Sequence, residues 1–183
     1  RDLHFQTKTT IDTLDYSGSG WNEGSKVVIA ACGPKRRELK AELPPDFNLP
    51  DGFSNPVFVQ PGILAIQAPK YENESGAIDN QRFAKEMEQY VSYFERHIPM
   101  ILLVDDSSFT AATLNNFLWV TFTRVNPSHD IHGVQSFVEN KHWGCRGGLV
   151  MDARKKPHHA PELVTDAAIS RRVDEILSGL KWK

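Results

Sequence analysis

The pattern of apolar and polar positions along the chain separates short strands from longer helices. Short apolar runs rich in β-branched residues, bounded by glycine or proline, are typical of buried strands. Runs of this kind predict strands at residues 26–32, 100–104, 134–138 and 149–152, and a strand region at residues 57–67 that is broken by Pro61 and Gly62. The run at 100–104, MILLV, has no polar face, which indicates a strand at the centre of a sheet.

Three other segments carry apolar residues at helical spacing, namely residues 79–94, 110–125 and 167–177. In the first of them we expect Asp79 to cap the free amides and Ile78 to pack across the first turn. Because strands and helices alternate along the chain, the sequence predicts an α/β domain with a mixed β-sheet flanked by helices.

The helix predicted at residues 110–125 is apolar nearly all round. Its apolar stripe consists of Leu114, Phe117, Leu118, Thr121 and Val125, with Trp119 and Phe122 on another side. A small sheet can cover only one side of such a helix. We therefore expect a neighbouring domain or a second subunit to cover the other side.

Composition narrows the class of protein further. The 183 residues are 40% apolar and 24% charged, which is typical of one globular domain. With 21 basic and 23 acidic residues the net charge is -2, which argues against a nucleic-acid partner. The chain has no signal segment, no apolar stretch of membrane-spanning length and only two cysteines, Cys32 and Cys145, so we expect a cytoplasmic protein without a transmembrane segment.

Four residues have the paired spacing of zinc ligands. They are His129 and His132, followed by His142 and Cys145. A predicted strand separates the two pairs, and histidine pairs in polar loops are more often solvated. The sequence favours the solvated interpretation and leaves the role of the group open.

Two acidic residues, Asp105 and Asp106, follow the predicted central strand. They could bind a cation, although carboxylates at a strand end more often cap the next helix. Arg124 lies at a predicted helix C-terminus, where the helix dipole favours a cation, and Asp130 is its expected ion-pair partner.

Two glycine-containing segments do not match known catalytic loops. Residues 17–20, SGSG, lack the spacing of a nucleophile elbow, and residues 144–148, GCRGG, lack the lysine of a phosphate-binding loop. No nucleophile, base and oxyanion site come together in the sequence. We therefore assign no residue of this chain as catalytic, cofactor-binding or metal-binding.

Several motifs, taken in order, resemble the C-terminal domain of the UbiD family, the prenylated-FMN-dependent decarboxylases that include the 3-octaprenyl-4-hydroxybenzoate carboxy-lyase. The order is a strand, Asp-Asp, a helix ending in Trp-x-x-x-Thr-Arg, and then Pro-x-x-Asp. The matching residues are Val104, Asp105, Asp106, Trp119, Thr123, Arg124, Pro127 and Asp130, with further similarity at 47–52, 63–71, 148–153 and 172–174. The chain departs from the family pattern at Ser107, where a third acid is common, and at residues 72–76, which replace a Pro-Gly-His-Ala turn.

The resemblance implies reversible, non-oxidative decarboxylation of an aromatic or α,β-unsaturated acid, a lyase reaction of quinone biosynthesis. It implies prenylated FMN with a divalent metal, held with the catalytic Glu-Arg-Glu set in an N-terminal region of a longer, homo-oligomeric protein. None of those motifs occurs here, and the chain begins at Arg1 rather than at methionine, so we expect an inactive C-terminal portion that mediates contacts between subunits and forms a wall of the active site.

The domain limits follow from the same resemblance. Residues 45–183 correspond to the UbiD C-terminal domain, and residues 1–44 are expected to form an N-terminal extension or linker with one strand. Residues 1–40 are more similar to the longer decarboxylases linked to menaquinone synthesis. The alternative is a stand-alone oligomerisation or binding module without enzymatic activity.

Overall fold

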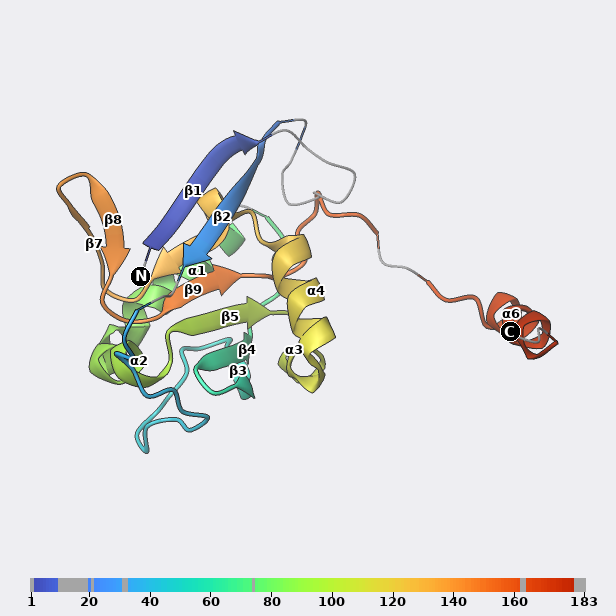
Figure 1. Ribbon diagram of the computed structural model, residues 1–183, viewed down its shortest axis with the longest axis horizontal. Coiled ribbons are helices and arrows are strands. Elements are labelled where there is room, and N and C mark those ends of the chain that lie inside the picture. Colours follow the sequence, from blue (N-terminus) through green and yellow to red (C-terminus); the bar gives the residue numbers. More distant parts are fainter. Residues whose placement is uncertain are drawn as a thin grey trace.

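A five-stranded mixed sheet forms the centre of the protein (Figure 1). The computed structural model describes residues 2–9, 20, 22–30, 33–73, 75–161 and 164–179. The strands follow the order β3 (Ser54–Gln60), β4 (Ile63–Gln67), β5 (Met100–Val104), β9 (Leu149–Asp152) and β6 (Ile131–Gly133). The middle three strands are parallel to one another, and each edge strand is antiparallel to its neighbour. The predicted fold class and the central place of MILLV are confirmed.

One face of the sheet is covered by the helical segment between β4 and β5. It consists of α1 (Ser75–Glu86), the short 3₁₀ helix η1 (Met87–Tyr90) and α2 (Val91–His97). The core on this face is built from buried aromatic and aliphatic side chains, among them Leu64, Ile66, Phe83, Met87, Phe94, Ile101, Leu103 and Val150. Phe47 and Leu49, from the irregular segment before β3, pack against this cluster as well. Alternate residues of the central strands supply this core, as the two-residue period of a strand requires.

The other face carries α3 (Ser107–Ala112), α4 (Leu114–Arg124) and the short α5 (Pro127–Asp130). Its core joins sheet residues of opposite parity to helix and loop residues: Ala65, Leu102, Val104, Phe117, Val120, Val125, Ile131 and Met151. Because both faces are covered, β5 is buried along nearly its whole length.

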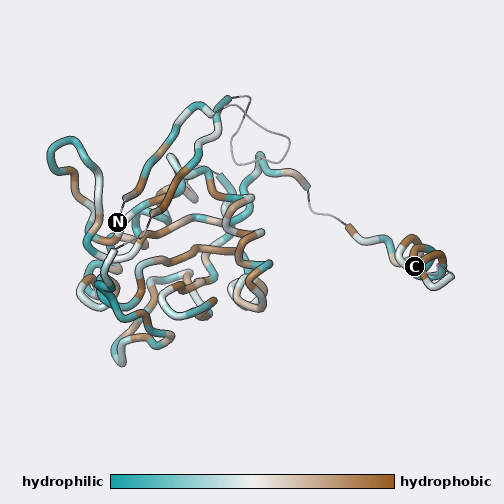
Figure 2. The backbone as a smooth tube through the Cα atoms, in the orientation of Figure 1, coloured by the Kyte–Doolittle hydropathy of each residue, from teal (hydrophilic) through white to brown (hydrophobic). Residues whose placement is uncertain are grey.

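The first predicted strand belongs to a separate hairpin. β2 (Gly24–Ala30) pairs with β1 (Asp2–Thr9) in an antiparallel sheet of two strands. The strand is confirmed, but its predicted burial is wrong, because a two-stranded hairpin covers its residues on one side only and the side chain of Val28 is 62% exposed. β2 is accordingly one of the apolar stretches on the outside of the molecule in Figure 2. Cys32, also in the predicted strand, lies outside the described residues.

The buried side chain of Ser25 links this hairpin to the rest of the domain by hydrogen bonds. The Ser25 hydroxyl donates to Oδ1 of Asn126 and accepts from the backbone N–H of Ser128, 2.8 Å away. These two partners flank the start of α5, so β2 is held by side-chain hydrogen bonds as well as by apolar contact.

Two predicted helices differ from the observed ones. The first begins at Ser75, four residues earlier than predicted, so Asp79 does not cap it and Ile78 is 64% exposed within it. The predicted helix at 110–125 is two helices, because Thr113 adopts an extended conformation and its hydroxyl caps α4 by accepting from the N–H of Asn116.

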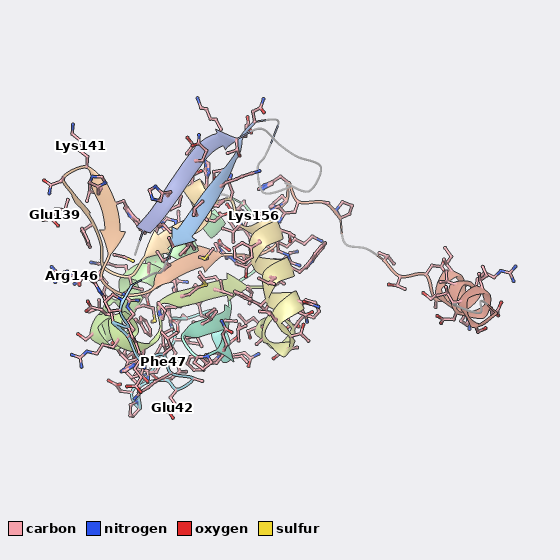
Figure 3. All side chains as sticks on the ribbon, in the orientation of Figure 1. Glu42, Phe47, Glu139, Lys141, Arg146 and Lys156 are labelled. Atoms are coloured by element: carbon pink, nitrogen blue, oxygen red, sulfur yellow. The ribbon has the colours of Figure 1, made fainter. Side chains whose placement is uncertain are left out.

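The strand predicted at residues 134–138 is confirmed only in its second part. Residues 136–138 lie in β7 (Ser136–Glu139), which forms a hairpin with β8 (His142–Cys145), whereas residues 134 and 135 lie between β6 and β7. The two residues between β7 and β8, Asn140 and Lys141, both have positive φ, as a two-residue hairpin turn of the primed type requires. Figure 3 shows Glu139 and Lys141 at the tip of this hairpin, directed away from the central sheet.

The last helix, α6 (Ala167–Ser178), is confirmed at its predicted place. Asp166 caps it by accepting from the N–H groups of Ala168 and Ile169. None of its residues is buried, and its apolar stripe of Ile169, Val173, Ile176 and Leu177 is 44% to 63% exposed. No helix in the described ranges has both the length and the apolar character to cross a membrane.

We predict that Gly148→Ala lowers the free energy of unfolding by about 1–3 kcal/mol, the usual cost of overpacking. A Cβ atom there would lie 2.7 Å from the backbone oxygen of Ile98, and a backbone atom cannot move aside cheaply. Gly179→Ala is the matched control, because its Cβ would meet the nearest oxygen at an ordinary 3.5 Å. Urea unfolding of both variants tests this, and equal stabilities would contradict it.

Candidate functional site

A pocket of about 950 Å³ opens where the three parallel strands end. Its walls come from the segments that follow β4, β5 and β9, together with α3 and α4: Gln67, Ala68, Lys70, Tyr71, Glu72, Asp105, Asp106, Phe109, Thr110, Val120, Arg124, Lys155, Lys156 and Pro157. We call this the carboxyl-edge pocket. In open α/β sheets ligands bind at the carboxyl ends of the parallel strands, and the volume is that of a small-molecule site.

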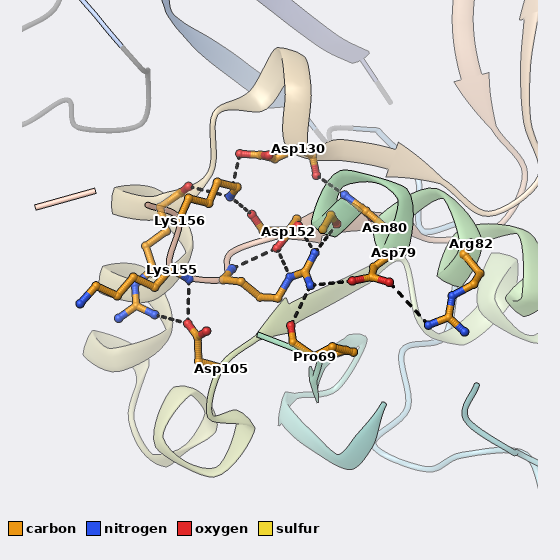
Figure 4. A network of polar contacts seen from close by, with 12 residues as sticks. Pro69, Asp79, Asn80, Arg82, Asp105, Asp130, Asp152, Lys155 and Lys156 are labelled. Carbon is orange, nitrogen blue, oxygen red and sulfur yellow. Dashed lines mark hydrogen bonds and ion pairs between the residues drawn. The ribbon is translucent and has the colours of Figure 1, made fainter. Parts of the chain in front are cut away.

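A network of polar contacts beside this pocket is organised by Arg154, whose side chain is 0% exposed. Figure 4 shows this network with the partner residues Pro69, Asp79 and Asp152 labelled. Its Nε and Nη2 atoms donate to the two carboxylate oxygens of Asp152 at 2.9 and 2.7 Å. Nη2 also donates to the carbonyl of Gly76, and Nη1 donates to the carbonyl of Pro69 and to Asp79. One guanidinium thus joins the end of β9, the segment after β4 and the first turns of α1.

The charge of Arg154 is maintained despite its burial. Desolvation is the strongest influence and lowers the pKa, but the hydrogen bonds and charges of Asp152 and Asp79 outweigh it and hold the pKa above its usual value. The guanidinium also lies 5.1 Å from the ring centre of Tyr71, which lines the pocket. The cation therefore fixes a pocket wall as well as the loops.

Lys156 makes a second buried cationic contact. Its ammonium lies 3.1 Å from Oδ2 of Asp130 and donates to the carbonyls of Asp152 and Arg124 at 2.9 and 3.3 Å. Burial raises the pKa of Asp130, against the opposing effects of Lys156 and the backbone N–H of Asn126. All three donors of Lys156 have acceptors, so its role is to hold α4, α5 and β9 together.

Arg124 pairs with Asp105 rather than with the predicted Asp130. Its Nη1 atom donates to Oδ2 of Asp105 at 2.9 Å, and the same oxygen accepts from the backbone N–H of Lys155 at 2.8 Å. The prediction was wrong because the ends of β5 and α4 meet in space, whereas Asp130 is buried beneath Lys156. Sequence proximity alone suggested the wrong carboxylate.

Asp106 has the structural role that the sequence favoured. Its carboxylate accepts from the N–H of Phe109 at 2.9 Å and so caps α3. The adjacent Ser107 hydroxyl, at the position where a third acid is common in the resembling family, donates to the carbonyl of Asn55 at 2.6 Å.

The four candidate zinc ligands lie on different elements. His129 is in α5 and its Nδ1 contacts the Ser128 hydroxyl, His132 is in β6, and His142 and Cys145 are at opposite ends of β8. Within the described ranges no three His, Cys, Asp or Glu residues form a group suited to a metal ion. The residues of the carboxyl-edge pocket do not fit a divalent metal either, because Asp105 and Asp106 are engaged as ion-pair partner and helix cap.

Sequence reasoning did not single out Arg154, Lys156 or Lys70. The signal available was the basic run at residues 154–156 directly after the strand LVMD, which indicates cations at a strand end. The spacing of apolar and polar residues cannot tell which of three consecutive cations are buried. The segment of Ser17 to Gly20, the other candidate loop, lies mostly outside the described residues.

No protein-family model matches the chain. An uncharacterized protein of Chlamydia trachomatis is 30% identical over 176 residues, which cover 94% of this chain and 28% of the relative. A second, from Chlamydia muridarum, is 31% identical over 173 residues with the same coverage of both chains. A 4-hydroxybenzoate decarboxylase subunit of Chlamydia pneumoniae is 26% identical over 180 residues, or 96% of this chain and 28% of the relative.

These comparisons make the chain a distant homologue of a protein named as a decarboxylase subunit. The chain spans about 28% of the length of the curated relatives that it matches. The fold and the pocket define it as an α/β domain with a ligand-sized cavity at the carboxyl edge of its sheet.

We predict that Arg154→Met lowers the free energy of unfolding by about 3–5 kcal/mol, because it leaves the buried Asp152 carboxylate without its partner. Arg172→Met is the control, since that side chain is 76% exposed in α6 and should change stability by less than about 0.5 kcal/mol. Chemical unfolding followed by circular dichroism measures both. Equal effects would show that Arg154 does not organise the fold.

A pH dependence follows from His159. Burial, with the positive charges of Lys156, His158 and Arg124, lowers its pKa from 6.5 to about 3, and its Nδ1 accepts from the N–H of Lys156. Between these two values the unfolded chain binds the proton and the folded protein does not. We therefore expect the free energy of unfolding to fall as the pH is lowered from about 6.5 toward about 3.

His159→Asn keeps an acceptor near the Nδ1 position and removes the titration. Urea unfolding at several pH values should give a smaller loss of stability in acid for this variant than for the wild type. Parallel pH profiles for the two proteins would rule out His159 as a source of the acid sensitivity.

Proposed function

We propose that this chain is the C-terminal region of a UbiD-like carboxy-lyase that acts on an aromatic or α,β-unsaturated acid. The proposal is supported by the homology to a 4-hydroxybenzoate decarboxylase subunit, which extends over 96% of the chain. In this proposal the chain forms part of a longer protein of about the size of the relatives, which extend well beyond the matched region.

The observation that carries the proposal is the convergence of the family-like motif residues. Asp105, Arg124, Asp130 and the aspartate of the LVMD strand are far apart in sequence, yet polar contacts link them around the carboxyl-edge pocket. A motif that merely stabilised separate helices would not require these residues to meet at one edge of the sheet.

The reaction replaces the carboxylate of the acid with hydrogen and releases CO₂, and prenylated FMN supplies the electron-accepting chemistry when it is bound. The proposal assigns the flavin, its divalent metal and the Glu-Arg-Glu set to the region outside this chain. The carboxyl-edge pocket, whose aspartates are already engaged, is then a wall of the active site and not the metal site.

A stand-alone oligomerisation module is the second candidate, and exposed apolar side chains favour it. On α4 these are Leu114, Leu118, Trp119 and Phe122, between 42% and 60% exposed. Such a face is consistent with a second subunit, and it equally suits the rest of a longer decarboxylase, which the first candidate requires.

The test uses the natural full-length protein with prenylated FMN, Mn²⁺ and either 4-hydroxybenzoate or cinnamate. We expect exchange of labelled bicarbonate into the carboxyl group of one of these acids, since the reaction is reversible. Residues 1–183 alone, under the same conditions, should neither retain flavin nor catalyse exchange.

Absence of both flavin binding and exchange in the full-length protein would overturn the decarboxylase proposal and favour the oligomerisation module. Flavin retention by residues 1–183 alone would contradict the assignment of the cofactor to another region. Mass spectrometry of the purified protein measures the flavin independently of turnover.

A further inference from the structure

We propose that the carboxyl-edge pocket binds the carboxylate group of an aromatic acid, with Arg124 as its main ligand and Lys70 as a second cation. The class of ligand rests on the proposed function, whereas the site rests on the geometry of the pocket. The proposal gives this chain a direct part in holding the acid.

The contacts of Arg124 within the protein fix its position but leave part of its guanidinium without a hydrogen-bond partner among the described residues. Only its Nη1 atom has a partner in the described part of the chain, the carboxylate of Asp105. The N–H groups on Nε and Nη2 are left for a ligand, and the side chain is 23% exposed at the pocket wall. That edge of a guanidinium matches the two oxygens of a carboxylate.

The backbone around Arg124 is fixed as well. Its carbonyl accepts from the buried ammonium of Lys156, which is itself tied to Asp130 and to the end of β9. Asp105 is held in turn by the N–H of Lys155. A guanidinium oriented by a carboxylate on one side loses little freedom when it binds a second carboxylate on the other.

The charges that line the pocket favour an anion. Four cations, Lys70, Arg124, Lys155 and Lys156, face three acids, Glu72, Asp105 and Asp106. The two aspartates are already bonded within the protein, to Arg124 and to the N–H of Phe109 respectively. Lys70 is exposed and has no ion pair or hydrogen bond among the described residues, so its ammonium is available.

The apolar part of the lining suits a ring. Tyr71, Phe109, Val120 and Pro157 line the same pocket as the cations, and its volume of about 950 Å³ exceeds that of one aromatic acid. Tyr71 is held in place because Arg154 and Lys156 lie 5.1 and 5.6 Å from its ring centre. An anion without a ring, such as inorganic phosphate, would use the cations and leave these side chains unused.

The test is a binding measurement on the natural full-length protein without cofactor, by isothermal titration calorimetry with 4-hydroxybenzoate. Arg124→Gln should weaken binding at least tenfold, and Arg124→Lys, which can still pair with Asp105, should weaken it less. Lys70→Gln should weaken it several-fold, and because Lys70 is exposed this variant does not depend on the stability of the Arg124 pair. The exposed Arg172→Gln on α6 is the matched control and should bind as the wild type does.

Two further ligands define the chemistry. 4-Hydroxybenzyl alcohol, which lacks the carboxylate, should bind weakly and equally to all variants, and inorganic phosphate should bind more weakly than the aromatic acid. Wild-type affinity in both Arg124→Gln and Lys70→Gln would overturn the proposed site, as would phosphate binding tighter than that of the acid.

Binding of the acid and exchange of its carboxyl group test the proposed site and the proposed function separately. Binding that depends on Arg124, without carboxyl exchange in the presence of cofactor, would retain the site and reject the decarboxylase. Exchange that is unchanged in Arg124→Gln, in rate and in the concentration of acid required, would retain the decarboxylase and reject the site.

Discussion

The buried guanidinium of Arg154 is the interaction on which the rest of the carboxyl edge depends. A charge taken out of water is strongly unfavourable unless charged and hydrogen-bonding partners replace the solvent. Asp152, Asp79 and two backbone carbonyls provide these partners, and they belong to segments more than 70 residues apart. The requirement to satisfy one cation therefore fixes how the loops after β4 and β9 meet α1.

Around this centre the cations divide into two kinds. Arg154 and Lys156 are buried and have protein acceptors for their donors, so they determine the shape of the pocket. Arg124 and Lys70 line the pocket. Of the guanidinium nitrogens of Arg124, only Nη1 has a partner among the described residues, the carboxylate of Asp105. A rigid shell of satisfied charges behind a partly satisfied arginine is the arrangement that lets a protein bind an anion without reorganising.

Apolar side chains on α4 and α6 remain exposed in this domain. Trp119 and Phe122 remain more than half exposed, and the stripe of α6 is uncovered along its length. The relatives are much longer than the matched region, so additional protein surface accompanies this domain in them. The prediction that α4 is covered by a neighbouring domain or a second subunit is consistent with both observations and remains a prediction.

The sequence by itself determined the elements whose signals are local. The unbroken apolar run of MILLV defined the central strand, the stripe at 167–177 defined α6, and Asp106 was expected to cap a helix, as it does. Only the tertiary structure decided that Arg124 pairs with Asp105 and that Arg154 and Lys156, two of three consecutive cations, are buried. The physical reason is that periodicity and capping act over a few residues, whereas ion pairs and burial depend on which distant segments the sheet brings to one edge.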